Sequence, residues 1–470
     1  MSRYTSVTPD DLGEMLEAIG VGSLQELFDR QIPAGVRLGR PLDLPEGLAE
    51  QEVYEHLREL ASRNVSTEDE ISFLGGGMYD HYVPAVVDML MERSEFLTPY
   101  TPYQPEVSQG GLQVMFEYQT AITELTALPV SNASVYEGPS AVAAAAYLAK
   151  LANGKGRVVV SRAVHPHSRR TLRTTAAGYG VEIVEVGLRD GVTDLDAWAA
   201  AIDQDTSAVI FQSPNYLGAV EDAAALAAAA KDGVGGNPIV IGSYDPIPLG
   251  ILKPPGECGV DVAVGEGQPL GNRLDFGGPS FGFFAATEAY LRRMPGRIAG
   301  ETRDVDGRRG FVLTLQTREQ HIRREKATSN ICTAQALNAL GGVVYLAWLG
   351  RQGLVELGEL LLQRTHYARE ALGALDGVEA SHPHPVVREF AVSLDVDGPD
   401  AVERVIDRCA AQGVSPGVPL GRDYPELGGG LLVAITERRT RAHIDRLTEV
   451  LGAAVAAERS GAPAPAGVAS

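Results

Sequence analysis

The chain has 470 residues, of which 44% are hydrophobic and 21% charged, a composition typical of a globular protein. At this length we expect more than one domain, because single hydrophobic cores stop growing well below it. The formal net charge of −21 excludes nucleic acid as an expected partner, since that binding depends on basic patches. No apolar run approaches the roughly 20 residues that cross a bilayer, so we also expect no membrane partner.

The first 65 residues are predicted to form an N-terminal arm. Thr8 as a cap, Pro9 in the first turn and Gly20 as the stop predict a first helix. Its acidic, amphipathic sequence lacks the parts of a secretory signal, and we therefore expect a cytoplasmic protein. The segment 1–65 has too little apolar surface to be a domain by itself. We expect it to wrap a neighbouring chain.

Residues 66–317 are predicted to form a large α/β domain. Six β-rich runs alternate with helical segments: RVVVS, VEIVEV, SAVIFQ, PIVIGSYD, VDVAVGEG and GFFAA. This alternation is typical of a mostly parallel sheet that is covered on both faces. Ligands of such sheets bind beyond the carboxyl ends of the strands, where Ser213, Asp245 and Gln268 fall.

Residues 318–457 are predicted to form a smaller C-terminal α/β domain. After a long helical stretch, its order is strand EFAVSLDV, a helix over 400–413, strand LLVAITE and an amphipathic helix from Thr440. The final segment 458–470 is rich in proline, glycine and alanine, and we expect it to be disordered.

A large and a small α/β domain together form the outline of the fold-type-I pyridoxal phosphate enzymes, although unrelated enzymes share that outline. Such an enzyme needs a strand-end carboxylate for the pyridine nitrogen, a helix N-terminus for the phosphate and a lysine for the cofactor's aldehyde. Asp245 is placed to be the carboxylate, or it simply begins a turn before Pro246. Ser140 lies in the first turn of a helix that could hold the phosphate, but the charge of Glu137 would repel it.

The lysine requirement is tested by elimination, because the chain contains only five lysines: Lys150, Lys155, Lys231, Lys253 and Lys326. The strand after that of Asp245 carries Gln268 or its neighbours where a lysine would be needed. Lys253 precedes two prolines that favour an extended surface loop. We therefore expect this chain to lack the lysine that joins the cofactor.

Two pairs of histidines resemble metal ligands at first sight. His165 and His167 form one pair, and His382 and His384 form the other. Each pair lies in a loop interrupted by proline, with no third ligand at suitable spacing, and we therefore expect no metal site.

Three long stretches carry a resemblance to a known family: Tyr100–Gly110, Gly265–Ala285 and Gly310–Thr333. From about Tyr4 to Gly452 the chain resembles the alpha subunit of the glycine cleavage system P-protein, glycine dehydrogenase (decarboxylating) subunit 1. The resemblance implies a heterotetramer of two alpha and two beta subunits with pyridoxal phosphate on a beta-subunit lysine. It also implies the H-protein as partner, whose lipoyl arm receives the aminomethyl group of glycine while carbon dioxide is released.

In this interpretation the subunit has no catalytic residue of its own. Ser140, Asp245 and Gln268 are then expected to line a vestigial cofactor cleft. The segment YTPYQP has a proline at every third position, which predicts a stiff polyproline strip. We expect it to contribute to the partner's active site through Tyr100, Thr101, Tyr103 and Gln104. The alternative is an aromatic corner packed inside the subunit.

Two other functions remain open at this point. The chain could be an autonomous pyridoxal phosphate lyase or aminotransferase that uses Lys253 or Lys326, or a purely structural scaffold. The role of the Arg-rich segment 318–326 is also open. Its cluster of His321, Arg323, Arg324 and Lys326 could bind a carboxylate or an acidic partner surface, or form a solvated helix face.

Overall fold

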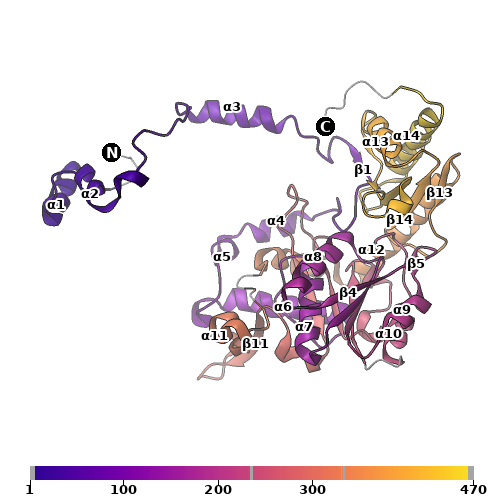
Figure 1. Ribbon diagram of the computed structural model, residues 1–470, viewed down its shortest axis with the longest axis horizontal. Helices are drawn as coiled ribbons and strands as arrows, with labels where there is room; N and C mark the ends of the chain where they lie inside the picture. Colours follow the sequence, from indigo (N-terminus) through magenta and orange to yellow (C-terminus); the bar gives the residue numbers. More distant parts are fainter. Residues whose placement is uncertain (1–5, 233–236, 330, 332–333, 464–470) are drawn as a thin grey trace. The chain divides into compact units, whose positions relative to one another are not determined.

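The computed structural model describes residues 6–232, 237–329, 331 and 334–463 (Figure 1). The chain divides into two compact units, 1–65 and 66–470. The predicted further division of the second unit at 317/318 stays a prediction. Among the described residues, no helix is both long enough and apolar enough to cross a membrane.

The first unit consists of short helices without a core of their own. Its elements are α1 (Pro9–Ile19), α2 (Leu24–Gln31), a 3-10 turn (Ala34–Val36) and α3 (Glu50–Ala61). The predicted boundaries of α1 are confirmed, since the Thr8 side chain accepts a hydrogen bond from Asp11 N and Gly20 ends the helix at φ 76°. None of the residues in α1, α2 and α3 is buried. The apolar side chains of these helices are therefore left without a packed interior.

The second unit is built around a seven-stranded sheet with the order β2-β10-β9-β8-β7-β3-β4. Its strands are β2 (Val130–Ser131), β3 (Arg157–Ser161), β4 (Glu182–Val186), β7 (Thr206–Ser213), β8 (Ile239–Tyr244), β9 (Val262–Glu266) and β10 (Gly282–Ala286). All six predicted β-rich runs form strands. The strands from β9 to β4 pair in parallel, and β10 is antiparallel to both β9 and β2. The prediction of a mostly parallel sheet is confirmed.

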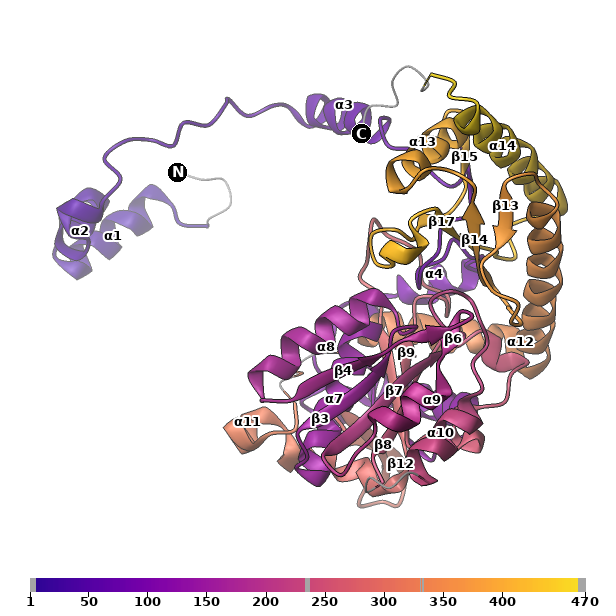
Figure 2. The same ribbon diagram turned by 45° about the vertical axis from the view of Figure 1, so that its right-hand side comes forward.

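Helices cover both faces of this sheet, and a hydrophobic core lies on each side. On one face the core includes α7 (Gly138–Asn153) and α8 (Pro166–Gly178). The core of the other face includes residues of α4 (Ala85–Met91), α6 (Gln109–Thr126), α9 (Leu195–Ala201), α10 (Ala223–Asp232) and α12 (Ala336–Gly373). Figure 2 shows β3, β4 and β7 side by side, with α8 and α9 next to them.

A second, antiparallel sheet has the order β13-β14-β17-β16. Its strands are β13 (Val378–Ala380), β14 (Glu389–Leu394), β16 (Val418–Pro419) and β17 (Gly430–Ala434), and its core includes residues of α13 (Pro399–Ala410) and α14 (Arg441–Arg459). The helix α12 leads to this sheet and has a break at Gly350, where φ is 61°. Residues 458 and 459 still belong to α14, and residues 464–470 of the predicted tail lie outside the described residues.

Smaller elements complete the second unit. Three two-stranded sheets pair β1 (Ile71–Ser72) with β15 (Val414–Ser415), β5 (Leu188–Arg189) with β6 (Val192–Thr193), and β11 (Ile298–Arg303) with β12 (Arg309–Thr314). The remaining helices are short: α5 (Ser94–Leu97), α11 (Gln320–Arg323), and the 3-10 helices η2 (Pro105–Val107), η3 (Pro248–Gly250), η4 (Pro255–Cys258), η5 (Glu288–Arg293), η6 (Gln316–Arg318), η7 (Arg324–Lys326) and η8 (Pro425–Leu427).

Candidate functional site

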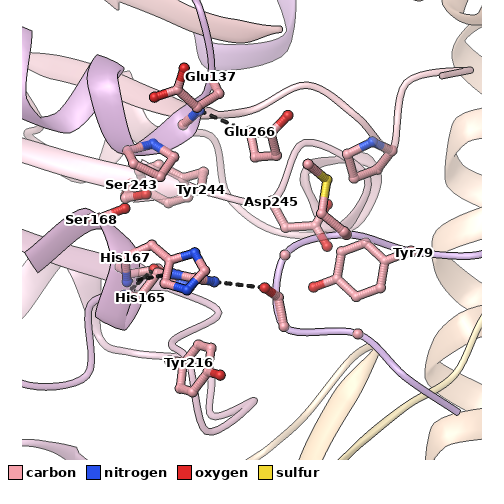
Figure 3. Close-up of a pocket in the computed structure, with 18 of the residues that line it drawn as sticks. Tyr79, Glu137, His165, His167, Ser168, Tyr216, Ser243, Tyr244, Asp245 and Glu266 are labelled. Atoms are coloured by element: carbon pink, nitrogen blue, oxygen red, sulfur yellow. Dashed lines mark hydrogen bonds between the residues drawn. The ribbon is translucent and has the colours of Figure 1, made fainter. Parts of the chain in front are cut away.

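A cavity of about 350 Å³ lies at the carboxyl edge of the large sheet. Asp245 follows β8, Glu266 ends β9, and Glu137 precedes α7. The segment 75–79, the start of α8 and Glu389 of β14 complete its lining. In Figure 3, Glu137 and Glu266 lie together at one end of the space, with His165 and His167 at its side. This is the edge at which parallel sheets bind ligands.

Asp245 lines this cavity, but its carboxylate is bound to a buried arginine. Arg388 Nη1 donates to both carboxylate oxygens of Asp245, at 2.9 and 3.2 Å. The guanidinium of Arg388 is 3.7 Å from the ring centroid of Tyr79, and its side chain is only 3% exposed. A paired and hydrogen-bonded charge is what makes burial of these two groups tolerable. The carboxylate of Asp245 is therefore not free to bind a pyridine nitrogen.

Glu389, next to Arg388, links the glycine-rich segment 75–79 to the four-stranded antiparallel sheet, which we call the small sheet. Its carboxylate accepts from Gly76 N at 2.6 Å and from the Tyr79 hydroxyl at 2.7 Å. Burial raises the pKa of Glu389 to about 7. Gly75 is required here, since a Cβ at this position would lie 2.4 Å from that of Ala434.

Gln268 lies behind the cavity and not in its lining. Its amide oxygen accepts from Tyr79 N at 2.9 Å, and its amide nitrogen donates to Tyr79 O at 3.0 Å and to Asn272 O at 2.9 Å. Gln268 is only 1% exposed, and both of its amide hydrogens and its amide oxygen are engaged in hydrogen bonds within the chain. None of the five lysines, all of which lie in the described residues, lines this cavity, and Lys253 is exposed.

The N-terminus of α7 is closed by two carboxylates. Glu266 Oε2 accepts from Gly138 N at 2.9 Å, and Glu137 Oε1 accepts from Ser140 N at 3.1 Å. The Ser140 hydroxyl in turn accepts from Glu137 N, so Ser140 belongs to a capping box. Burial raises the pKa of Glu266. Ser140 lines a different cavity from Asp245, so the structure does not bring these two predicted site residues together.

His165 also binds the glycine-rich segment 75–79. It precedes α8, where its Nδ1 accepts from His167 N at 3.0 Å. Its Nε2 therefore carries the proton and donates to Gly76 O at 2.6 Å. Burial lowers the pKa of His165 to about 4, which keeps the ring neutral. Among the described residues, no three His, Cys, Asp or Glu side chains are grouped so that they could hold a metal.

The residues of this cavity do not fit pyridoxal phosphate. A cofactor phosphate would need the free amides of a helix N-terminus, but Glu137 and Glu266 already occupy them and would repel a dianion. The pyridine nitrogen would need the carboxylate that Arg388 holds. No lysine lines the space to join the cofactor. Internal contacts take up the phosphate and pyridine positions, and the lining contains no lysine.

The strip from Tyr100 to Gln104 lies on the surface. Tyr100 is 74% and Tyr103 63% exposed, and Gln104 is exposed as well, so these residues are not an aromatic corner packed inside the subunit. The Thr101 hydroxyl is buried and has no partner among the described residues. The guanidinium carbon of Arg297 lies 5.4 Å from the centroid of the Tyr103 ring.

The predicted polyproline geometry of this strip is wrong. Tyr103 N donates to Thr101 O at 2.9 Å, whereas a polyproline helix has no internal hydrogen bonds. Pro102 is buried and Pro99 is exposed, so the prolines do not share one face.

Several residues that shape the cavity were missed in the sequence. Arg388, Glu389 and Tyr79 form its central contacts, yet each lies far in the chain from Asp245. Two signals could have found them. The run GGGMY at 75–79 indicates a backbone that is approached closely. The charged pair Arg388 and Glu389 at the start of the apolar strand EFAVSL is unusual for a buried strand.

The doubly covered, mostly parallel sheet with a carboxylate beyond β8 defines a fold-type-I pyridoxal phosphate fold. A glutamate decarboxylase from Lactobacillus brevis shares this fold with a TM-score of 0.66 over 90% of this chain and 96% of its own, at 13% identity. A crystal structure of glycine decarboxylase (P-protein) of the glycine cleavage system, in inhibitor-bound form, is much more similar. Its TM-score is 0.88 at 43% identity, over 96% of this chain and all of the other.

The family model of the glycine cleavage system P-protein matches residues 2–451. A probable glycine dehydrogenase (decarboxylating) subunit 1 from Geotalea uraniireducens is 49% identical over 96% of this chain and its own full length. Its counterpart from Carboxydothermus hydrogenoformans is also 49% identical, over 96% of this chain and 99% of its own. The chain belongs to the glycine cleavage system P-protein family.

Proposed function

We propose that this chain is the alpha subunit of a glycine decarboxylase. It acts in an α2β2 heterotetramer with glycine dehydrogenase subunit 2, the beta subunit, which carries pyridoxal phosphate on a lysine. Together the subunits decarboxylate glycine and transfer the aminomethyl group to the lipoyl arm of the H-protein, with release of carbon dioxide. The names of the most similar relatives and the P-protein structure support this proposal.

The set of internal contacts made by Asp245, Glu137 and Glu266 in the lining of the cavity is the single observation that supports the division of labour between subunits. The cofactor stores the electrons of the bond that breaks when carbon dioxide leaves. In this chain Arg388, Glu266 and Gln268 hold the positions that such a cofactor would need. The chemistry is therefore assigned to the beta subunit, and no catalytic residue is assigned to this one.

The exposed strip is proposed to complete the partner's active site. Tyr100 and Tyr103 present phenols to the outside of this subunit, and Gln104 adds an amide. In the complex these groups would orient glycine and exclude water while carbon dioxide leaves. Thr101 belongs to the same proposed contact, but its hydroxyl is buried and would have to turn outward to gain a partner across the interface.

The N-terminal arm supports the existence of a partner chain by a separate argument. Within this unit, apolar side chains such as Leu42, Leu44 and Leu57 are more than half exposed. A segment with no core of its own gains stability only when another surface covers it. We propose that the arm covers part of the beta subunit.

The alternative of an autonomous pyridoxal phosphate enzyme receives no support from the geometry. Lys253 is exposed, and neither it nor Lys326 lines the cavity that contains Asp245. The scaffold alternative differs from our proposal in one respect, since it assigns no role in turnover to Tyr100 and Tyr103.

Co-expression with the candidate beta subunit tests the proposal. We expect a stable complex that exchanges the carboxyl group of glycine with bicarbonate, while the isolated chain shows neither exchange nor covalently bound pyridoxal phosphate. Exchange by the isolated chain would contradict the proposal. A chain that forms no complex with the beta subunit would do so as well.

Removal of two hydroxyl groups separates a role in turnover from a scaffold. Tyr100→Phe/Tyr103→Phe keeps both rings, so the complex should form normally while exchange falls about tenfold or more. Tyr82→Phe removes a hydroxyl from another exposed tyrosine and serves as the control. Unchanged exchange in the double variant would favour the scaffold.

A further inference from the structure

A cavity of about 400 Å³, which shares no lining residue with the one around Asp245, collects positive charge. Five cationic side chains line it: Arg292, Arg293, Arg318, Arg323 and Lys326. They come from η5, η6, α11 and η7, and each lies at or next to the end of its short helix. In a chain with a net charge of −21, such convergence of cations is a local feature and not a consequence of composition.

Arg318 forms the buried floor of this cavity. Its residue is 8% exposed, and its guanidinium donates to Gly296 O at 2.7 Å and to Met294 O. These bonds fix the plane of the guanidinium group. The Nε–H of Arg318 has no acceptor among the residues that the structure describes. A buried donor without an acceptor costs free energy that a bound ligand atom would recover.

Among the described residues, the rim carries no carboxylate, although the buried Glu319, outside the lining, lies close enough to act on Arg318. Within the described part of the chain, Arg292, Arg293, Arg323 and Lys326 form no ion pair. Cations that face one space without counter-charges repel one another. An anion that bound between them would remove this repulsion. Thr317 and Thr328 add two hydroxyl groups to the lining, which can donate hydrogen bonds to such an anion.

Backbone strain occurs at two positions in the segment that carries Arg318, Arg323 and Lys326. Leu315 and Arg324 each have a φ of 54°, a left-handed conformation that is unfavourable for residues other than glycine. Leu315 comes directly before the helix of Arg318, and Arg324 lies between Arg323 and Lys326. Strain of this kind is concentrated at ligand-binding segments of proteins.

We propose that this cavity binds a phosphate dianion, either as free phosphate or as the phosphate group of a small ester. The unpartnered Nε–H of Arg318 can donate to one phosphate oxygen, and the cationic and hydroxyl groups of the rim can donate to the remaining ones. The volume is within the range of about 300 to 1,000 Å³ that small-molecule sites occupy. This inference does not depend on the proposed decarboxylase function, and it assigns a role to Arg323 and Lys326.

Calorimetric titration of the full chain tests this inference at constant ionic strength, with chloride as the balancing ion. Inorganic phosphate and glycerol 3-phosphate are the two probes. We expect saturable binding with one site per chain. Equal affinity for both probes would identify the phosphate group as the whole ligand, and tighter binding of the ester would identify an ester. Saturable binding of neither probe would overturn the inference.

A matched pair of double variants locates the site. Arg323→Gln/Lys326→Gln removes two exposed cations of the rim, and we expect about a tenfold or greater loss of affinity. Lys253→Gln/Arg351→Gln removes one exposed lysine and one exposed arginine elsewhere and should leave the affinity unchanged. An equal loss in both variants would mean that phosphate responds only to total charge, which would overturn the site. Binding of a glutamate-rich peptide without binding of phosphate would also overturn it.

Discussion

The cavity around Asp245 and the strip from Tyr100 to Gln104 use their polar side chains in opposite ways. In the cavity, the carboxylate of Asp245 binds Arg388 and that of Glu389 binds the glycine-rich segment. In the strip, two tyrosines face solvent and a threonine hydroxyl has no partner among the described residues. Polar groups that are satisfied within the chain hold its structure together. Only groups with unused hydrogen-bonding capacity are free to serve another chain.

The largest expected effect concerns the buried ion pair of the cavity. Arg388→Leu leaves the Asp245 carboxylate without its partner and should lower the free energy of unfolding by about 3–5 kcal/mol. Urea unfolding measures this change. Asp245→Asn/Arg388→Leu removes both charges and should recover most of the loss. A small change in unfolding free energy for Arg388→Leu would mean that Asp245 does not depend on Arg388 and is available to a ligand. The cavity would then not differ from the strip in this respect.

The pH dependence of stability should reflect Glu389. Its pKa of about 7 in the folded chain lies above the ordinary value of 4.5, so the folded state holds this proton more tightly than the unfolded state. Stability is therefore lost as the pH rises from 4.5 through about 7, by up to about 3 kcal/mol. Glu389→Gln cannot ionise, and its profile of unfolding free energy between about pH 5 and pH 8 should be flatter.

A control for the loss of one charge sharpens this measurement. Glu403→Gln changes an exposed glutamate of α13, and its profile should follow that of the unsubstituted chain. A Glu389→Gln profile with the same slope as the unsubstituted chain would contradict the role given to this carboxylate.

A lysine restored beyond β9 should not restore a cofactor site. Gln268→Lys loses the bonds to Tyr79 and Asn272, and we expect a loss of about 2 kcal/mol in unfolding free energy. Borohydride treatment should fix no pyridoxal phosphate to the variant, because Glu137 and Glu266 still close the phosphate position. Gln268→Met loses the same bonds without adding charge. Covalent attachment to the lysine variant would show that the cavity still accepts the cofactor.

The smallest effect on stability is expected in the strip. Tyr100→Ala/Tyr103→Ala removes two exposed side chains and should change the unfolding free energy of the isolated chain by less than about 1 kcal/mol. Tyr118→Ala, at a buried position of α6, should cost about 3–5 kcal/mol by the same measurement. A large loss in the double variant would mean that the strip holds the fold together, as the cavity does.

Local patterns predicted the fold well because they depend on neighbouring residues. The cap at Thr8, the stop at Gly20 and the six apolar runs of the large sheet all follow from short-range chemistry. Asp245 is placed at the carboxyl edge because it directly follows an apolar strand of a parallel sheet. Such features need no knowledge of distant parts of the chain.

The contacts that decide the chemistry of the cavity could not be predicted in this way. The partner of Asp245 is Arg388, which directly precedes β14 of the other sheet, and only the folded chain brings them together. Ser140 was expected at a cofactor cleft, but its capping box with Glu137 uses its hydroxyl locally. In the strip, a proline at every third position predicted a polyproline helix, but the hydrogen bond from Tyr103 N to Thr101 O forms a turn instead.

The glycine-rich segment 75–79 connects the two sheets through hydrogen bonds to both sides. Gly76 is bonded to Glu389 of the small sheet, and Tyr79 is bonded to Gln268 beyond β9 of the large one. A rocking motion of one sheet against the other would have to break these bonds together with the Arg388–Asp245 pair. The second unit should therefore behave as a single rigid block. A rigid surface loses little conformational entropy when another protein docks on it, which favours tight association.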